Sequence, residues 1–316
     1  MHGQFSWYDL MTANPAAAKR FYPAVTGWGL EEWDQADYTM WTASGVPLGG
    51  INPITPEQAA QGVPPHWLAY VTVDDVEGTT NKVRSLGGQV MHGPESIPGV
   101  GRFAIIQDPQ GAILAIIKSE TPSDGFDGTP GLGKFTWHEL MTTDYKRAFD
   151  FYRQVFGWEK TGETEMGDVG PYLMYGMKGK DFGGIFNRPA RVGQMPPSWT
   201  YYVNVKDVKK SIDVAKSTGA RVSRGPTEIP DGVFAILTDP QGAMFAVFQA
   251  KAAAAARPAS KPKTKAKKAT KSKAKAKARK PKARKAKAAA RRPKKAAKSR
   301  SKPKAKAKSR KRAKRR

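Results

Sequence analysis

Residues 7–28 read WYDLMTANPAAAKRFYPAVTGW, and residues 137–158 read WHELMTTDYKRAFDFYRQVFGW. When residues 5–28 are aligned with 135–158, 11 of the 24 positions are identical. The similarity continues downstream, since the sequence Asp-Pro-Gln-Gly occurs at 108–111 and again at 239–242. A repeat of this length indicates that the chain consists of two copies of one unit.

Each copy begins with a pattern that predicts a strand followed by a helix. Residues 5–11 alternate with a period of two, which is typical of a strand. Asn14-Pro15 is a helix start, because Asn caps the backbone and Pro in the first turn loses no needed hydrogen bond. Gly27 ends the predicted helix. In the second copy Asp144 and Gly157 take the same two roles.

A second unit follows in each half. In the first half it consists of a strand at 66–73, a helix at 76–86 and a hairpin closed by the turn at 108–111. Each half therefore reads β-α-β-β-β twice, which predicts an α+β protein of two tandem domains with a core in each. The predicted parts are the domains 1–118 and 133–250, a Gly/Pro-rich linker at 119–132 and a tail at 251–316.

The two ends of the chain differ in charge. Residues 251–316 contain 33 of the 54 Lys and Arg and none of the 27 Asp and Glu, so residues 1–250 have a net charge of −6. Cysteine is absent, which suits a reducing compartment. The N-terminus has no signal-peptide pattern, and no apolar run reaches the roughly 18 residues of a membrane span. We expect a soluble, cytoplasmic protein.

Three motifs occur in both halves: W-x-D/E-L-x-T near the start, F-Y followed by G-W after the first helix, and D-P-Q-G-A near the end. With these motifs the chain resembles the vicinal oxygen chelate (VOC) superfamily, which includes glyoxalases, bleomycin resistance proteins and ring-cleaving dioxygenases. It is most similar to the two-domain glyoxalase-like members, over residues 4–118 and 134–249. The resemblance implies two βαβββ modules per domain, with curved mixed sheets around a cavity where metal-using members hold a divalent ion.

The metal-ligand positions implied by the resemblance carry unsuitable side chains. Divalent metals prefer imidazole, carboxylate or thiolate ligands. The six positions are instead Trp7, Leu68 and Ala115 in the first domain and Trp137, Thr200 and Ala246 in the second. We therefore predict no metal and no other cofactor.

Asp9 and Glu139 are the candidate catalytic residues. Each shares a strand face with a Trp and a Met, and partial desolvation there raises the pKa of a carboxyl and suits it to proton transfer. Alternatively, each acid only caps backbone N–H groups or pairs with a cation at the sheet rim. The predicted ligand contacts on the same two faces are Trp7, Met11, His66, Leu68, Tyr70, Trp137, Met141, Thr200 and Tyr202.

Four further residues have plain alternatives to a functional role. His66 follows two prolines and is favoured as an exposed loop-end residue. His138 points away from Glu139 by strand alternation, so a His–Glu dyad is not expected. Arg102 is either a cation for an anionic ligand or a solvated strand end. Trp28, like its counterpart in the second copy, is expected to anchor the core.

The tail consists almost entirely of Lys, Arg, Ala, Pro and Ser, so it cannot bury a core and is expected to be disordered. It resembles the tails of linker histones and bacterial histone-like proteins. Polycations bind phosphate backbones without reading the base sequence. We expect the tail to contact DNA of the nucleoid, or RNA, through residues such as Lys261, Lys263, Lys265, Lys267, Lys268, Arg291, Arg292, Arg310, Lys311 and Arg312. A solubility tail or a contact to another polyanion is the alternative.

Three functions follow from these observations. The first is a protein that binds a small molecule in metal-free aromatic cavities and is tethered to nucleic acid. The second is a lyase, isomerase or dioxygenase-like enzyme that uses Asp9 or Glu139 as acid or base. The third is a nucleoid-associated protein whose body only spaces or dimerises the tails. The loss of the metal ligands weighs against metal-dependent catalysis, and the paired acids weigh against a mere spacer.

Overall fold

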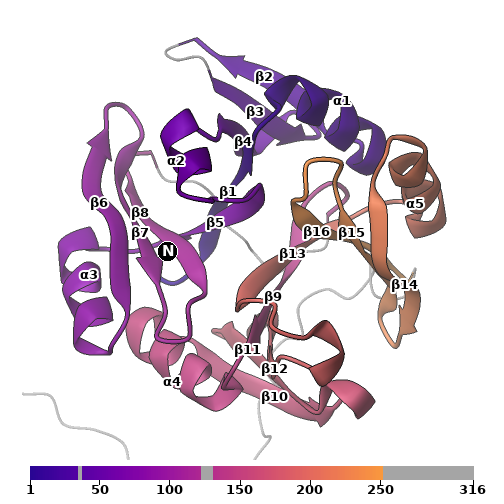
Figure 1. Cartoon of the computed structure of the whole chain (residues 1–316). Coiled ribbons are helices and arrows are strands. Elements are labelled where there is room, and N and C mark those ends of the chain that lie inside the picture. Colours follow the sequence, from indigo (N-terminus) through magenta and orange to yellow (C-terminus); the bar gives the residue numbers. More distant parts are fainter. Residues whose placement is uncertain (35–37, 122–130, 252–316) are drawn as a thin grey trace, which may run out of the picture. The chain divides into compact units, whose positions relative to one another are not determined.

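The computed structural model describes residues 1–34, 38–121 and 131–251 (Figure 1). Each half of the chain forms one mixed sheet of eight strands, which confirms the α+β class and the two tandem domains. The strands of the first half are β1 (Phe5–Thr12), β2 (Gly29–Trp33), β3 (Tyr38–Ala43), β4 (Val46–Pro53), β5 (His66–Thr72), β6 (Gln89–Ile97), β7 (Gly101–Gln107) and β8 (Ile113–Ser119). Those of the second half are β9 (Phe135–Thr142), β10 (Glu159–Glu165), β11 (Pro171–Met177), β12 (Lys180–Asn187), β13 (Ser198–Asn204), β14 (Arg221–Ile229), β15 (Gly232–Thr238) and β16 (Met244–Ala250).

The strand order shows how two modules make one sheet. It is β2-β3-β4-β1-β5-β8-β7-β6 in the first half and β10-β11-β12-β9-β13-β16-β15-β14 in the second. β1 is parallel to β4 and antiparallel to β5, and β9 pairs in the same way with β12 and β13. Each sheet therefore joins two βαβββ modules through their first strands.

The helices are α1 (Pro15–Thr26), α2 (Pro56–Ala60), α3 (Val76–Ser85), α4 (Tyr145–Phe156) and α5 (Val208–Ser217), with the short 3-10 helices η1 (Gly167–Val169) and η2 (Ala190–Val192). The four longer helices begin and end within a residue of the predicted bounds, while α2 and the two 3-10 helices were not predicted. Asn14 and Asp144 cap α1 and α4 by accepting a backbone N–H, each at 3.0 Å. Gly27 and Gly157 end these helices with φ of 80° and 75°, a left-handed conformation that favours glycine.

Edge strands are the elements that the sequence did not locate. β2, β6, β10 and β14 lie at the edges of the two sheets. Their side chains are mostly exposed or half-buried, and none of them is buried. Without a buried side, these segments lack the alternation of apolar and polar residues that identifies a strand in sequence.

The prediction of two separate cores is wrong. One continuous cluster of buried side chains contains residues of both halves, including Tyr8, Trp28, Phe135 and Trp158. The reason is that the helix-covered sides of the two sheets face each other, with α1 packed against α5 and α3 against α4 (Figure 1). Trp28 and Trp158 are 4% and 2% exposed, so their role as core anchors is confirmed.

The contacts between the halves are reciprocal. Tyr22 in α1 donates to Asp239 of the β15–β16 turn, and Tyr152 in α4 donates to Asp108 of the β7–β8 turn, both at 3.0 Å. The indole of Trp28 donates to the carbonyl of Gly133, while that of Trp158 donates to the carbonyl of Gly3. In these four bonds each half gives the other what it receives, whereas Ser211 of α5 donates to the Val25 carbonyl as a further bond between the halves.

A bulge in β1 separates two of its aromatic residues. Phe5 pairs with Val71 and Trp7 with Tyr70, so the register shifts by one residue at Ser6. Phe5 therefore lies in the shared core, while Trp7 lies on the opposite side of the sheet. The same shift occurs in β9 between residues 135 and 137. Strict alternation would have put Phe5 and Trp7 on one face.

Two predicted parts lie outside the described residues. They are most of the linker 119–132 and, apart from Lys251, the tail 251–316 with all ten predicted nucleic-acid contacts. In the part of the chain that the structure describes, no helix has the length and apolar character needed to cross a membrane.

Candidate functional site

The candidate residues meet on one side of each sheet, which we call the open face because α1, α3, α4 and α5 pack on the other side. On the first open face Trp7 lies beside Tyr70, Asp9 beside Leu68, and Met11 beside His66. On the second, the corresponding pairs are formed by Trp137, Glu139 and Met141 with Tyr202, Thr200 and Ser198. All eleven predicted catalytic and ligand residues therefore lie on these two faces.

The central residues of the open faces are shielded from solvent, although none of the longer helices of the described chain covers these faces. Asp9 is 4% and Leu68 3% exposed, and Thr200 on the second face is 6% exposed. Trp7 and Tyr70, in contrast, are half-buried. On the first face the side chains of Tyr38, Trp7 and Tyr70 lie directly on Asp9 and cover it. The first open face thus has a buried floor and partly exposed aromatic walls, while on the second face Thr200 and Tyr202 are buried and Glu139 and Trp137 are half-buried.

Asp9 forms the centre of a cluster of hydrogen bonds, the first acid cluster. Its Oδ1 accepts from Tyr38 at 2.6 Å and from the Trp7 indole at 3.0 Å, and its Oδ2 accepts from Tyr70 at 2.9 Å. Burial raises the pKa of the Asp9 carboxyl, and hydrogen bonds from Tyr38, Tyr70, Trp7 and Asn52 oppose that shift. A carboxylate has about four acceptor positions, so those of Asp9 are largely taken.

Tyr38 reaches Asp9 across an intervening strand. It lies in β3, and β4 runs between β3 and β1. Gly50 in β4 pairs with Asp9, and a Cβ at Gly50 would overlap the ring of Tyr38. Because Gly50 has no side chain, the tyrosine can lie flat over β4. Gly184 has the same relation to Tyr172 in the second half.

Glu139 forms the second acid cluster with fewer bonds. It accepts from Tyr172 at 2.9 Å and from Tyr202 at 3.0 Å, while the Trp137 indole donates to Tyr172 instead of the acid. Burial raises the pKa of Glu139, and the two tyrosines and the charge of Arg224 lower it in part. With about two acceptor positions free, Glu139 is better placed than Asp9 to take a proton.

Tyr38 and Tyr172 were missed by the sequence analysis as site residues. The plain alternative proposed there for the acids, a backbone cap or a pair with a cation, also differs from the structure, in which tyrosines are the main partners. One signal was available, because the repeat places a tyrosine at the start of both corresponding strands. Its reach to the acid depends on the glycine between them.

The family's divalent metal does not fit these faces. In the residues that the structure describes, no three His, Asp or Glu side chains lie close enough together to hold an ion. The six positions implied by the resemblance contribute only indole, alkyl and hydroxyl groups, and each cluster contains a single carboxyl already bonded to tyrosines. These residues are not a ligand set for a divalent ion.

The two histidines named in the sequence analysis have backbone partners. His66 is half-buried, its Nδ1 donates to the Pro64 carbonyl at 2.7 Å, and burial lowers its pKa. His138 lies in the shared core on the opposite side of the sheet from Glu139, so the absence of a His–Glu dyad is confirmed.

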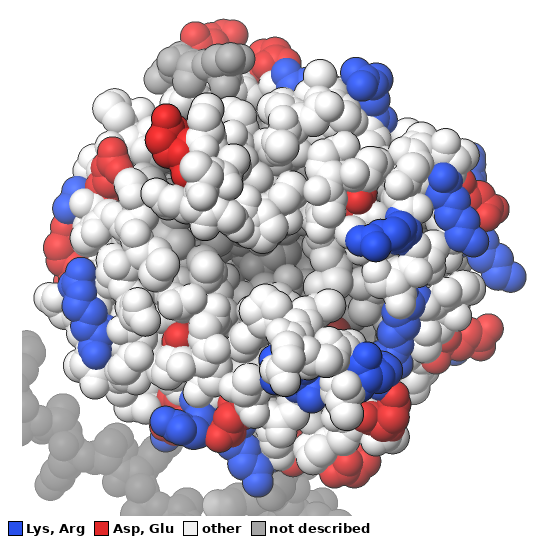
Figure 2. Space-filling model, in the orientation of Figure 1, with Lys and Arg blue, Asp and Glu red and all other residues white. Residues whose placement is uncertain are grey.

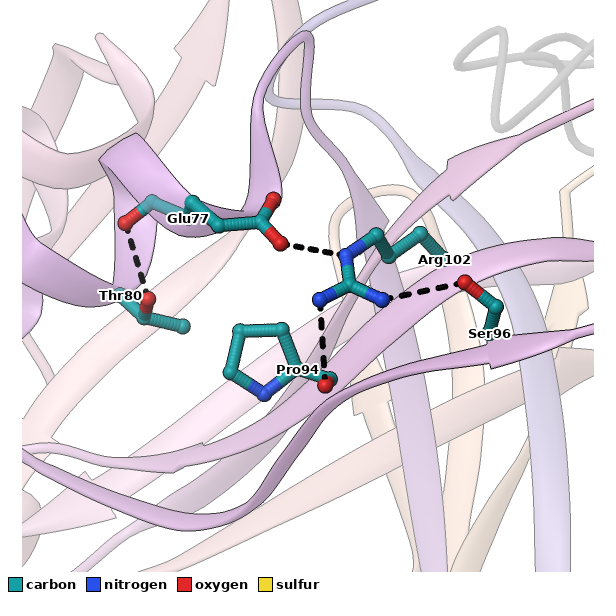
Figure 3. Close-up of polar contacts among 5 residues, drawn as sticks. All are labelled: Glu77, Thr80, Pro94, Ser96 and Arg102. Carbon is teal, nitrogen blue, oxygen red and sulfur yellow. Dashed lines mark hydrogen bonds and ion pairs between the residues drawn. The ribbon is translucent and has the colours of Figure 1, made fainter. Parts of the chain in front are cut away.

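Arg102 is engaged by its own domain. Its guanidinium donates to Glu77 of α3 at 2.5 Å, to the Ser96 hydroxyl at 3.0 Å and to the Pro94 carbonyl at 3.3 Å (Figure 3). These bonds use donors on all three nitrogens, so we do not include Arg102 in the site.

A surface cavity lies apart from the candidate residues. This cavity of about 180 Å³ lies between α4 and the β7–β8 turn, and is lined by Leu86, Pro109, Gln110, Arg147, Asp150, Phe151 and Gln154. Figure 2 shows one face of the molecule, where acidic and basic side chains are mixed around the periphery and uncharged residues surround a central hollow.

Known proteins share this sequence pattern and fold. The model of the Glyoxalase/Bleomycin resistance protein/Dioxygenase superfamily matches residues 4–116 and 134–247. The protein named "Putative glyoxylase CFP32" of Mycobacterium tuberculosis is 33% identical over 252 residues, which covers 78% of this chain and 95% of that protein. "Anthracycline biosynthesis protein DnrV" of Streptomyces peucetius is 28% identical over 263 residues, covering 78% and 93%.

Solved structures agree on the fold. The 2,3-dioxygenase LapB from Pseudomonas sp. KL28 superimposes with a TM-score of 0.55 at 13% identity, covering 79% of this chain and 93% of that one. The Mn(II)-bound glyoxalase from Novosphingobium aromaticivorans gives a TM-score of 0.54 at 15% identity, covering 78% and 82%. Two family matches on two eight-stranded sheets show that the chain belongs to the Glyoxalase/Bleomycin resistance protein/Dioxygenase superfamily.

Proposed function

We propose that this glyoxalase-like protein binds a small planar aromatic molecule on its open faces without a metal ion, and that its tail tethers it to nucleic acid. The observation that carries the first part is the pairing of half-exposed aromatic walls, such as Trp7 and Tyr70, with a buried acid floor. Aromatic side chains favour flat apolar ligands through offset or edge-to-face stacking. The name of the Streptomyces relative, an anthracycline biosynthesis protein, supports the same ligand class.

Binding can be tested with anthraquinone-2-carboxamide, a neutral planar probe. It should quench tryptophan fluorescence, because Trp7 and Trp137 lie half-buried on the open faces. In Trp7→Phe and Trp137→Phe variants the quenched signal should fall, while Trp28→Phe, in the core, is the matched control. Saturable quenching that is equal in all four proteins, or no quenching, would refute binding on the open faces.

The tail is proposed to bind nucleic acid non-specifically and to associate the protein with the nucleoid. Its 33 cations and lack of acids support this, whereas residues 1–250 have a net charge of −6. Gel shifts on a DNA duplex should show binding by the full chain that weakens steeply with salt, because counterions are released. A chain ending at residue 251 should not bind. Equal binding by the two proteins would remove this role from the tail.

A second candidate function is acid–base catalysis by Glu139. The observation that favours it is the raised pKa of a carboxyl with about two acceptor positions unused. An active enzyme would be a lyase, isomerase or dioxygenase-like protein, and Glu139→Gln would lower kcat by about 10²-fold or more. Asp9→Asn should have a smaller effect on turnover. A folded body that only spaces the tails would bind no aromatic probe, and neither Glu139→Gln nor Asp9→Asn would change any activity.

A further inference from the structure

The two open faces carry different charges at one matched position. In the second half, neighbouring strands place Arg224 beside Ile236, Ile236 beside Ala246, and Ala246 beside Tyr202. In the first half the same path begins at His92 and runs through Ile105, Ala115 and Tyr70. Paired residues on adjacent strands point to the same side of a sheet, so Arg224 and His92 occupy equivalent places on the two open faces.

The surroundings of these two residues differ in one decisive way. His92 lies 2.7 Å from the Glu95 carboxylate, a partner on its own strand. At the position equivalent to Glu95 the second half has Thr227, since both residues pair with the matched phenylalanines Phe103 and Phe234. Within the described residues no carboxylate lies within 4.0 Å of Arg224. The positive charge of Arg224 is therefore not neutralised by an ion pair in the described chain.

Arg224 also lies next to the aromatic wall. Its guanidinium carbon is 5.6 Å from the centre of the Phe234 ring, and that ring is 5.7 Å from the ring of Tyr202. A guanidinium held over an aromatic ring can still present its edge to a carboxylate. Its charge reaches the floor of the face, because it lowers the pKa of both Glu139 and Tyr202.

The floor of the second face is more polar than that of the first. Thr200 and Ser198 stand where the first face has Leu68 and His66. The Ser198 hydroxyl is buried and has no hydrogen-bond partner in the described residues. The Glu139 carboxylate is held by two tyrosine hydroxyls, which disperse its charge. The second face thus combines a cation with a floor that carries two hydroxyl side chains.

We propose that the second open face selects planar aromatic anions, with Arg224 binding the anionic group while the ring stacks on the half-buried Trp137, which packs against Phe234 and Tyr202. The first open face, where His92 already has a carboxylate partner, takes uncharged aromatic ligands. This inference rests on the proposed function, since it names the ligand class of one of its two binding faces.

The test compares anthraquinone-2-carboxylate with anthraquinone-2-carboxamide, which have the same shape and differ in charge. Both are titrated calorimetrically into the full-length protein and its variants at 0.15 M salt, so that the tail is present in every sample. In Arg224→Gln the affinity for the carboxylate probe should fall by about tenfold, which corresponds to the loss of one charge-assisted bond. The affinity for the carboxamide probe should stay within about twofold of the wild-type value. Arg224→Lys should retain part of the preference. His92→Gln, at the matched position, should change neither probe.

The possible failures are distinguishable. If neither probe binds the wild-type protein, the proposed function fails and this inference with it. If both bind but Arg224→Gln weakens them equally or not at all, only the selectivity of the second face is overturned. A loss of carboxylate binding in His92→Gln equal to that in Arg224→Gln would also overturn it. Unchanged circular dichroism and melting temperature exclude misfolding as the cause of any loss.

Discussion

Tyr8 and His138 occupy the same position in the two copies of the repeat, and they bond to each other across the shared core, with the tyrosine hydroxyl 2.6 Å from Nε2. Nδ1 of His138 is 2.8 Å from the Phe182 carbonyl, which can only accept, so Nδ1 carries the proton and Nε2 accepts from Tyr8. Phe5 stacks on His138 and Phe135 stacks on Tyr8, each with ring centres 3.8 Å apart. The two copies therefore meet at equivalent residues.

This pair predicts a loss of stability in acid. Burial lowers the pKa of His138 to about 3. Because the folded-state pKa of His138 is below the usual value, its neutral form contributes fully to the free energy of unfolding above about pH 6.5. This contribution is lost as the pH falls toward 3, at about 1.4 kcal/mol per pH unit. Denaturant unfolding from pH 7 to pH 4 should show a loss of stability below about pH 6.5 that is steeper in the wild type than in His138→Gln by this amount. The raised pKa values of Asp9 and Glu139 act in both proteins and cancel. Identical slopes would contradict the prediction.

The reciprocal interface predicts that the halves assemble as separate chains. Residues 1–121 alone would expose Phe5, Tyr22 and Trp28, all buried in the shared core. Burial of one such side chain is worth about 1.5–3 kcal/mol. Co-expressed 1–121 and 131–251, with a tag on one, should therefore purify as a 1:1 complex. Recovery of the tagged half alone, monomeric and as stable as the full chain, would contradict this.

The two tyrosine–aspartate bonds between the halves predict unequal costs. Tyr152→Phe removes one bond to the Asp108 carboxylate and should cost about 1.5–3 kcal/mol of unfolding free energy. Tyr22→Phe should cost more, because Tyr22 donates to Asp239 and also accepts from the Trp67 indole at 3.0 Å. Chemical denaturation of both variants measures the difference. Equal costs for the two variants would show that the bond to Trp67 contributes nothing.

The glycine beneath Tyr38 predicts a coupled loss of stability and binding. Gly50→Ala would push the Tyr38 ring away from Asp9 and should destabilise the protein by about 1–3 kcal/mol, the usual cost of overpacking. It should also weaken aromatic ligands on the first face. Tyr38→Phe, which keeps the ring in place but loses the hydroxyl bonded to Asp9, serves as the control: it should cost about 1.5–3 kcal/mol and leave the aromatic wall intact. An alanine variant as stable as the wild type would mean that the ring has room to move.

The sequence was sufficient for the features that repeat locally. Helix caps at Asn14 and Asp144 and the turn at Asp108 need only their neighbours, and they form as predicted. The placement of Asp9 beside Trp7 on one face also follows from strand alternation.

What the sequence could not predict depends on residues far apart in the chain. Tyr38 reaches Asp9 only because β4 presents a glycine between them. Asp108 is held by Tyr152 of the other half, and its other oxygen accepts three backbone N–H groups of its own turn. Phe5 enters the core through a bulge that no pattern of apolar residues indicates. These relations require the register of the sheets and the packing of one half on the other.

The reciprocal exchange of bonds between the halves has an evolutionary consequence. Two identical subunits related by a twofold axis must place the same residue on both sides of that axis, so every substitution is made twice. Joined in one chain, the copies are free to differ, as Tyr8 and His138 do at the axis and His92 and Arg224 do on the open faces. Duplication within one chain thus permits two unlike binding faces in a fixed one-to-one ratio, which a symmetric pair of subunits cannot have.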